Sequence, residues 1–462
     1  MILRFAASMR HTGAQHLGSR PMRLRNTLLI LAALAGVFSV AIGRIARETT
    51  TEAQAEHIAA HNETAYMLPP ALLQKAVALD RTERILTIAG TLWTPIQLLL
   101  ILVLGVAAWM QRFASRLFRS RWAQGFSFVF MLVVILRLLD LPLGIVAHRI
   151  ALSYGLSVQG WSSWLADDAK VFALEWLIGG LLTMLIFRVI RRSPARWWFW
   201  FWIPVVLLLL AVVFVTPYII DPLFNKFEPL AQSNPALVQQ LEQVVARGGI
   251  SIPPQRMFLM KASVKSTQLN AYVTGFGASK RVVVWDTTVA KCSPEEISFI
   301  FAHEMGHYAL NHIVTGVALT CLALLPLFWL GFHGVQFLLL RYGSAWRVPS
   351  QRDWGALIVL LLVLSVLSTL SDPFANAFSR VIEHNADVYG QEAVHGIVAD
   401  PQTIGRQAFQ TLGELSLDDP TPHPLFELWF GTHPTIRFRA AFAQAYDPWA
   451  AGQHPKYFSA RQ

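Results

Sequence analysis

Long apolar segments constrain this 462-residue chain more than any other feature of its sequence. A helix needs about 20 apolar residues to cross the hydrocarbon core of a bilayer. Segments near or above that length occupy residues 27–43, 85–110, 126–145, 172–190, 197–219, 313–340 and 355–370. A single such segment can be a buried core helix. Seven of them in one chain, with 54% hydrophobic and only 14% charged residues, predict an α-helical polytopic membrane protein with seven transmembrane helices.

Arginines at the ends of these segments account for much of the net charge of +10, so the charge does not indicate a nucleic-acid partner. They gather in four places, before the first span and after the second, fourth and sixth: Arg4, Arg10, Arg20, Arg23 and Arg25; Arg112, Arg116, Arg119 and Arg121; Arg188, Arg191, Arg192 and Arg196; Arg341, Arg347 and Arg352. Basic residues near span ends are retained in the cytoplasm. The pattern predicts a cytoplasmic N-terminus and non-cytoplasmic segments after the fifth and seventh spans.

The sequence His-Glu-Met-Gly-His at residues 303–307 is the clearest chemical motif. On a helix, His303 and His307 leave the same face, so both imidazoles can bind one Zn²⁺ at about 2.0–2.1 Å. Glu304 would lie where its carboxylate reaches a water beside the metal and not the metal itself. The same motif also arises by chance on buried helices, so the rest of the sequence must support it.

A second motif, Glu383-His384-Asn385-Ala386-Asp387, offers a third ligand. Catalytic zinc commonly has three protein ligands and leaves the fourth position to water. Glu383 and Asp387 share a helical face, so Glu383 can bind the metal while Asp387 accepts the spare N–H of a ligand imidazole. The alternative is two solvated carboxylates on a surface helix. His384 is a weaker ligand candidate, because it points about 100° away from Glu383.

The two motifs lie in segments outside the spans, for which we predict a zincin-like α+β catalytic region. Helical spacing covers residues 235–247, short strands are expected at 256–260, 271–274 and 282–285, and a capping box at 293–296 begins the HEMGH helix. We divide the chain into a basic tail (1–26), a five-span membrane domain (27–220), a catalytic region with the HExxH helix (221–312), spans six and seven (313–370) and a C-terminal catalytic region with the third ligand (371–462).

Five stretches resemble the CAAX prenyl protease 1 family, integral-membrane zinc metallopeptidases of the HExxH gluzincin type. They are PLFNKFEPL (222–230), NAYVTGFGASKRVVVWDT (270–287), AHEMGHYALNH (302–312), SRVIEHNAD (379–387) and THPTIRFR (432–439). The resemblance implies one zinc per chain bound by His303, His307 and Glu383. It also implies that Glu304 is the general base and that Asp387 supports the ligands.

The resemblance further implies roles for three residues that spacing alone does not single out. His433 would stabilise an oxyanion, Asn270 would hold the substrate backbone at an edge strand, and Arg439 would be structural. The seven helices would wall a chamber with the zinc at one end. In eukaryotic members the zinc faces the cytosol, whereas the arginines of this chain predict the opposite side.

We therefore expect a membrane-embedded zinc endopeptidase, in a bacterial inner membrane, that uses a zinc-activated water and Glu304 as general base. Its partners would be the lipid bilayer and a peptide or protein substrate, lipidated or otherwise membrane-associated. One alternative is a quality-control protease that admits unfolded membrane proteins. Another is a catalytically silent scaffold or transporter, although a scaffold has no need of Glu304.

Overall fold

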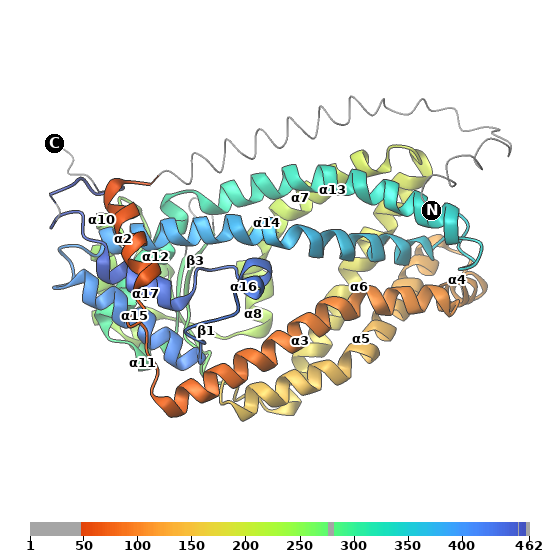
Figure 1. Ribbon diagram of the computed structural model, residues 1–462. Coiled ribbons are helices and arrows are strands. Elements are labelled where there is room, and N and C mark those ends of the chain that lie inside the picture. The colour runs from red at the N-terminus through yellow and green to blue at the C-terminus, as the bar shows by residue number, and fades with distance from the viewer. Residues whose placement is uncertain (1–47, 276–280, 451, 459–462) are drawn as a thin grey trace, which may run out of the picture. The chain divides into compact units, whose positions relative to one another are not determined.

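The computed structural model describes residues 48–275, 281–450 and 452–458, which form helices and one small sheet (Figure 1). Six helical segments there are long and apolar enough to cross a membrane: α3 (Pro70–Val103), α5 (Arg121–Ser153), α6 (Trp161–Arg192), Trp197–Phe224, α13 (His312–Tyr342) and α14 (Ala356–Ala393). The polytopic helical fold is thus confirmed. The tail and the predicted span at 27–43 lie outside the described residues, so a seventh helix and a chamber stay predictions.

Several helices begin or end at other residues than the apolar segments from which the spans were predicted. α3 ends at Val103, because Gly105 adopts a left-handed φ of 71°, and the separate helix α4 (Val106–Leu117) follows. The segment Trp197–Phe224 consists of α7 (Trp197–Val215), the π-helical turn η1 (Thr216–Ile220) and α8 (Asp221–Phe224). α14 continues well past residue 370 to Ala393, so one unbroken helix carries both an apolar half and Glu383.

The sheet has the strand order β1-β2-β4-β3, with β1 (Phe227–Pro229), β2 (Met257–Met260), β3 (Ala271–Thr274) and β4 (Arg281–Trp285). β4 pairs parallel with β2 and antiparallel with β3, in a register that sets Ala271 opposite Val284. β3 is therefore an edge strand. The three predicted strands are present, and the three-residue β1 is an addition that its short sequence did not signal.

The remaining elements surround the HEMGH helix, α12 (Pro294–Ala309). They are α2 (Thr50–His61), α9 (Leu230–Ser233), α10 (Pro235–Arg247), η2 (Pro254–Arg256), α11 (Asp286–Lys291), α15 (Pro401–Ser416), α16 (Pro424–Phe430) and α17 (Ile436–Ala445). α12 packs against α10, α14, α15 and β3, and α2 packs against α17. In one core, Phe299, Phe301 and Met305 of α12 are almost fully buried. α12 is thus held on several sides.

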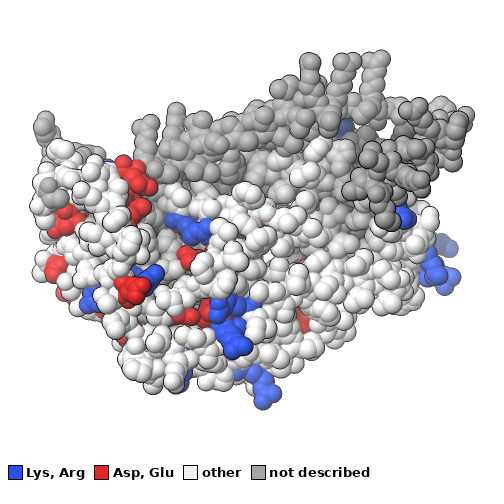
Figure 2. All heavy atoms as spheres, in the orientation of Figure 1, with Lys and Arg blue, Asp and Glu red and all other residues white. Residues whose placement is uncertain are grey.

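Charge differs between the two ends of the helices. Figure 2 shows only Lys and Arg side chains at the end where α4 lies, whereas Asp and Glu side chains lie among further Lys and Arg side chains toward the other end, near α2. Since α2 packs on α17, the segment that follows residue 47 lies at the same end as α12.

Candidate metal centre

The HEMGH motif is held in place by the start of its own helix. Ser293 Oγ accepts a hydrogen bond from the Glu296 backbone N–H, and Glu296 accepts one from the Ser293 N–H at 2.7 Å, which completes the predicted capping box. The other carboxylate oxygen of Glu296 accepts from the Thr411 hydroxyl at 2.8 Å, which ties α12 to α15. The first turn of α12 is thus fixed both locally and through a neighbouring helix.

α14 crosses α12 closely because two glycines lie at the crossing. A Cβ on Gly390 would lie 3.0 Å from the backbone nitrogen of His303. A Cβ on Gly306 would lie 3.1 Å from the Tyr389 side chain. Larger residues at either position would push the helices apart, so the glycines allow Glu383 of α14 to reach the two histidines of α12.

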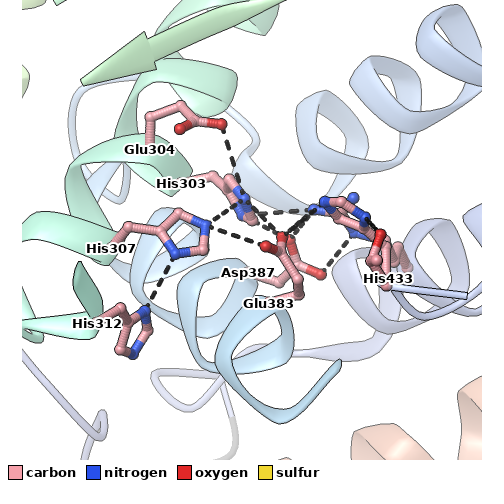
Figure 3. A network of polar contacts seen from close by, with 9 residues as sticks. His303, Glu304, His307, His312, Glu383, Asp387 and His433 are labelled. Atoms are coloured by element: carbon pink, nitrogen blue, oxygen red, sulfur yellow. Dashed lines mark hydrogen bonds and ion pairs between the residues drawn. The ribbon is translucent and has the colours of Figure 1, made fainter. Parts of the chain in front are cut away.

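Three donor atoms converge at this crossing, as Figure 3 shows. The Nε2 atoms of His303 and His307 lie 3.2 Å apart, and Glu383 oxygens lie 3.3 Å from the first and 3.5 Å from the second. A tetrahedral zinc with ligand bonds of about 2.0–2.1 Å has ligand atoms about 3.3–3.4 Å apart. Glu383 Oε2 is buried without a hydrogen-bond partner among the described residues. The donor set and its spacing fit a zinc ion.

Asp387 and Arg439 support His303 from behind. His303 Nδ1 donates to Asp387 Oδ1 at 2.8 Å, and Arg439 donates to both oxygens of Asp387, at 2.7 and 2.9 Å. The Asp387 side chain is only 3% exposed, and the Arg439 guanidinium stacks 4.5 Å from the Phe409 ring centroid. The contact at Nδ1 leaves Nε2 of His303 free to act as the ligand atom.

His307 has an analogous support that the sequence did not single out. His307 Nδ1 lies 3.2 Å from Nδ1 of His312, which is buried at the start of α13. Asn311 adopts a left-handed φ of 57° between α12 and α13, and this change of direction brings His312 back against His307 (Figure 3). His312 belongs to one of the five family-like stretches, which is the only sequence signal it has.

Glu304 lies beside the donor atoms without joining them. Its Oε1 atom is 4.0 Å from His303 Nε2, and its side chain is 24% exposed. Burial raises the pKa of the Glu304 carboxyl group above its ordinary value. The carboxylate is thus placed to exchange a proton with a water molecule near the three donors.

His433 reaches the same centre from the loop between α16 and α17. Its Nε2 atom lies 3.3 Å from Glu383 Oε2, and its Nδ1 atom contacts the Thr432 hydroxyl at 2.8 Å. Partial burial of this side chain, which is still 53% exposed, lowers its pKa. Arg380 of α14 donates to the carbonyl oxygens of Glu427 and Gly431, so it anchors the end of α16 just before His433. The other His-Pro pair lies elsewhere, since His423 caps α16 and lines a different cavity.

Asn270 immediately precedes the edge strand β3, which packs against α12. Its backbone is fixed on both sides: its N–H donates to Thr288 Oγ1 at 2.9 Å, and its carbonyl accepts from the Trp285 N–H and from the Thr288 hydroxyl. The residue itself is exposed. The side chain is therefore presented at the sheet edge by a rigid backbone.

A helical membrane fold that carries an HExxH helix and a downstream glutamate defines a membrane-embedded metallopeptidase. Two family profiles match the chain: Peptidase family M48 over residues 231–447, and "CAAX prenyl protease N-terminal, five membrane helices" over residues 54–226. The chain belongs to peptidase family M48, with the membrane domain of the CAAX prenyl proteases, and is a metalloendopeptidase.

Similar proteins come from bacteria and from eukaryotes. A Bacillus subtilis (strain 168) protein named "Uncharacterized metalloprotease YhfN" is 34% identical over 74% of this chain and 79% of its own length. CAAX prenyl protease 1 of Saccharomyces cerevisiae is 28% identical over 69% of this chain and 72% of its own. The crystal structure of S. mikatae Ste24p, 24% identical, superposes with a TM-score of 0.70 over 93% of this chain and all of that chain, and so shares the fold.

Proposed function

We propose that the chain hydrolyses peptide bonds with one zinc ion held by His303, His307 and Glu383. The observation that carries this proposal is the convergence of one ligand atom from each residue within 4.8 Å at the crossing of two helices, with the two Nε2 atoms 3.2 Å apart and the two Glu383 oxygens 3.3 and 3.5 Å from them. When bound, zinc would polarise the scissile carbonyl group and lower the pKa of the attacking water toward about 7. The family implies a metal cofactor, and the imidazole and carboxylate donors favour zinc.

Glu304 acts as the general base in this proposal. Its carboxylate lies 4.0 Å from His303 Nε2, which is farther than two ligands of one tetrahedral zinc ion lie from each other. The carboxylate is still close enough to contact a water molecule at the metal. Glu304 accepts the proton of the attacking water and later delivers it to the leaving amine. A pKa raised by burial suits a carboxylate that must take up and release a proton near neutral pH.

His433 stabilises the oxyanion that forms on the scissile carbonyl. The Thr432 hydroxyl can donate to Nδ1, which leaves the hydrogen on Nε2, the atom that faces the metal ligands. A lowered pKa favours this neutral form. Removal of one such donor typically slows turnover about 10²–10³-fold.

The ligands are oriented by two different acceptors. Asp387 accepts the Nδ1–H of His303, and its own charge is balanced by Arg439. His312 accepts the Nδ1–H of His307 through its own Nδ1, which requires His312 to be neutral. Each acceptor keeps the Nε2 lone pair of its histidine directed at the metal.

The substrate is a membrane-associated peptide or protein segment that binds in an extended form. Among the described residues, β3 pairs with a strand on one side only, so its other edge can add one more strand, and Asn270, beside its first residue, would hold the substrate backbone. Because several relatives are named CAAX prenyl protease 1, the proposed substrates include lipid-modified proteins. The quality-control alternative predicts cleavage of unfolded segments with little sequence preference.

We infer that the zinc-bearing end lies on the non-cytoplasmic side of a bacterial inner membrane. Arginines follow the second, fourth and sixth predicted spans, at the end opposite to α12, and basic residues resist translocation. The similarity to a Bacillus subtilis protein supports a bacterial setting.

Metal analysis of purified variants tests the ligand assignment. Glu383→Ala should lose most of its zinc at a free zinc concentration that saturates the unmodified protein. Glu295→Ala is the matched control, because Glu295 is an exposed acid at the start of the HEMGH helix. Full retention of zinc by Glu383→Ala would show that Glu383 is not a ligand.

A further inference from the structure

A second cluster of metal-ligand side chains lies where side chains of α2 and α14 meet. Glu52 and Glu56 are one turn apart on α2, and His384 comes from α14. His384 Nε2 lies 2.9 Å from Glu56 Oε1 and 3.4 Å from Glu52 Oε1. One ligand atom from each residue falls within 4.8 Å of the others. More than 300 residues separate His384 from the two glutamates in sequence, so the tertiary fold and not local spacing assembles the cluster.

His384 Nε2 lies at ion-pair distance from both carboxylates. Both ring nitrogens are buried, and neither makes a contact with hydrogen-bond geometry within the described part of the chain. Glu383 Oε2 at the proposed zinc site shows the same combination of close approach and absent hydrogen bond. The His384 ring is fixed by Phe442, whose ring centroid is 4.5 Å away in an edge-to-face arrangement. Its Nε2 is thus held toward α2.

The cluster holds more carboxylates than fixed cations. Glu48, just before α2, adds a third carboxylate to Glu52 and Glu56. The facing basic groups are Lys456, whose Nζ lies 2.7 Å from Glu52 Oε1 and 2.9 Å from Asn385 Oδ1, and Arg380. Glu52 Oε2 accepts the Thr49 N–H. One oxygen of Glu52 is therefore shared with Lys456, and His384 is the one basic side chain in contact with Glu56 among the described residues.

There is room for an ion and its water ligands. A cavity of about 320 Å³ adjoins the cluster and is lined by Glu48, Glu52, Glu56, His384 and Lys456, among others. The Glu56 side chain is 30% exposed, whereas that of Glu52 is 1% exposed. The cluster is therefore buried at Glu52 and reaches solvent at Glu56.

We propose that Glu52, Glu56 and His384 bind a second divalent transition-metal ion, in addition to the zinc held by His303, His307 and Glu383. Mixed imidazole and carboxylate donors suit Zn²⁺ and its neighbours in the first transition row. Lys456 keeps Asn385 as an acceptor when the ion takes the Glu52 oxygen. A bound ion joins α2 to α14 one residue from the ligand Glu383.

Zinc binding to the intact, zinc-loaded protein tests this proposal. Equilibrium dialysis at increasing free zinc should give two zinc ions per chain, the second bound more weakly. Glu56→Gln should weaken the second site at least about tenfold and leave the first site and peptide cleavage unchanged. Glu63→Gln, which removes an exposed acid just beyond α2, is the control and should bind like the unmodified chain.

Thermal unfolding separates metal binding from a folding defect. Zinc beyond one ion per chain should raise the Tm of the unmodified protein but not that of Glu56→Gln or His384→Gln. If His384 is instead protonated and pairs only with the two glutamates, the protein will stay at one zinc per chain at every free zinc concentration. That result, or an unaltered second site in Glu56→Gln, would overturn the proposal.

Discussion

Nδ1 of His312 lies 3.2 Å from Nδ1 of His307. The two atoms cannot both carry a hydrogen in a favourable contact, so one ring donates and the other accepts. If His307 binds metal through Nε2, its Nδ1 must hold the hydrogen, and His312 must be neutral and accept it. The two histidines proposed as ligands are therefore in contact with chemically different partners, a carboxylate for His303 and an imidazole for His307.

We predict that His312→Ala lowers zinc affinity about 10–100-fold, as loss of a group that orients a metal ligand usually does. His312→Gln should recover part of the affinity, because its amide oxygen can accept the same hydrogen. The measurement is zinc content at fixed free zinc set by a chelator. If His312→Ala holds zinc as tightly as the unmodified protein, the contact with His307 has no role in metal binding.

Arg439→Ala should destabilise the fold by about 3–5 kcal/mol, because it leaves the Asp387 carboxylate buried without its bidentate partner. Asp387 is 3% exposed and Arg439 11% exposed, so water cannot replace the lost contacts without rearrangement. Arg439→Lys keeps the charge but not the paired geometry and should be intermediate. Thermal unfolding in detergent measures both. A Tm for Arg439→Ala equal to that of the unmodified protein would contradict the inferred burial of this pair.

Local spacing explains how much of the site could be predicted from the sequence. The capping box at Ser293, the i,i+4 pair His303 and His307, and the shared face of Glu383 and Asp387 all follow from helix geometry. His312 could not be found this way. On a continuous helix it would point about 140° around the axis from His307. Only the left-handed turn at Asn311 reverses the chain and brings the two rings together.

Long-range packing accounts for what the sequence did not show. Nothing in the sequence near Glu52 indicates that its side chain meets His384 of α14, so this cluster appears only in the folded chain. The end of α14 is a second example. Hydropathy falls after residue 370 and leaves open whether the short last span continues past Ser371, whereas in the structure the helix continues to Ala393. The sequence therefore predicts the class of the chain, the candidate ligands and the support from Asp387, but not the contact of His312 with His307 or the cluster around His384.

His433→Ala should slow turnover about 10²–10³-fold while zinc content stays unchanged, as expected for loss of one oxyanion donor. His423→Ala is the matched control, because it alters the other His-Pro pair, which lies against α3 and α16. Steady-state cleavage of a fluorogenic peptide by both variants is the measurement. Loss of activity in His423→Ala with normal activity in His433→Ala would reverse the assignment.

Single-cysteine labelling tests the inferred topology. An impermeant maleimide added to intact cells should modify Asp418→Cys and leave Arg121→Cys unmodified, because the arginine pattern puts residue 121 inside. The native thiols should interfere little. Burial raises the pKa of Cys292 to about 12, so only about one molecule in 10⁴ carries the reactive thiolate at pH 8. Cys321 lies within α13. Labelling at position 121 but not at 418 would reverse the proposed orientation.

Replacement of Glu304 tests the central claim most directly, since it separates metal binding from catalysis. Purified Glu304→Gln should retain one zinc at the His303, His307 and Glu383 site and the unfolding temperature of the unmodified protein, yet cleave peptides at least about 10²-fold more slowly because no base accepts the water proton. Glu383→Ala, assayed in parallel, should lose both zinc and activity. Cleavage by zinc-loaded Glu304→Gln at a rate near that of the unmodified protein would contradict the account.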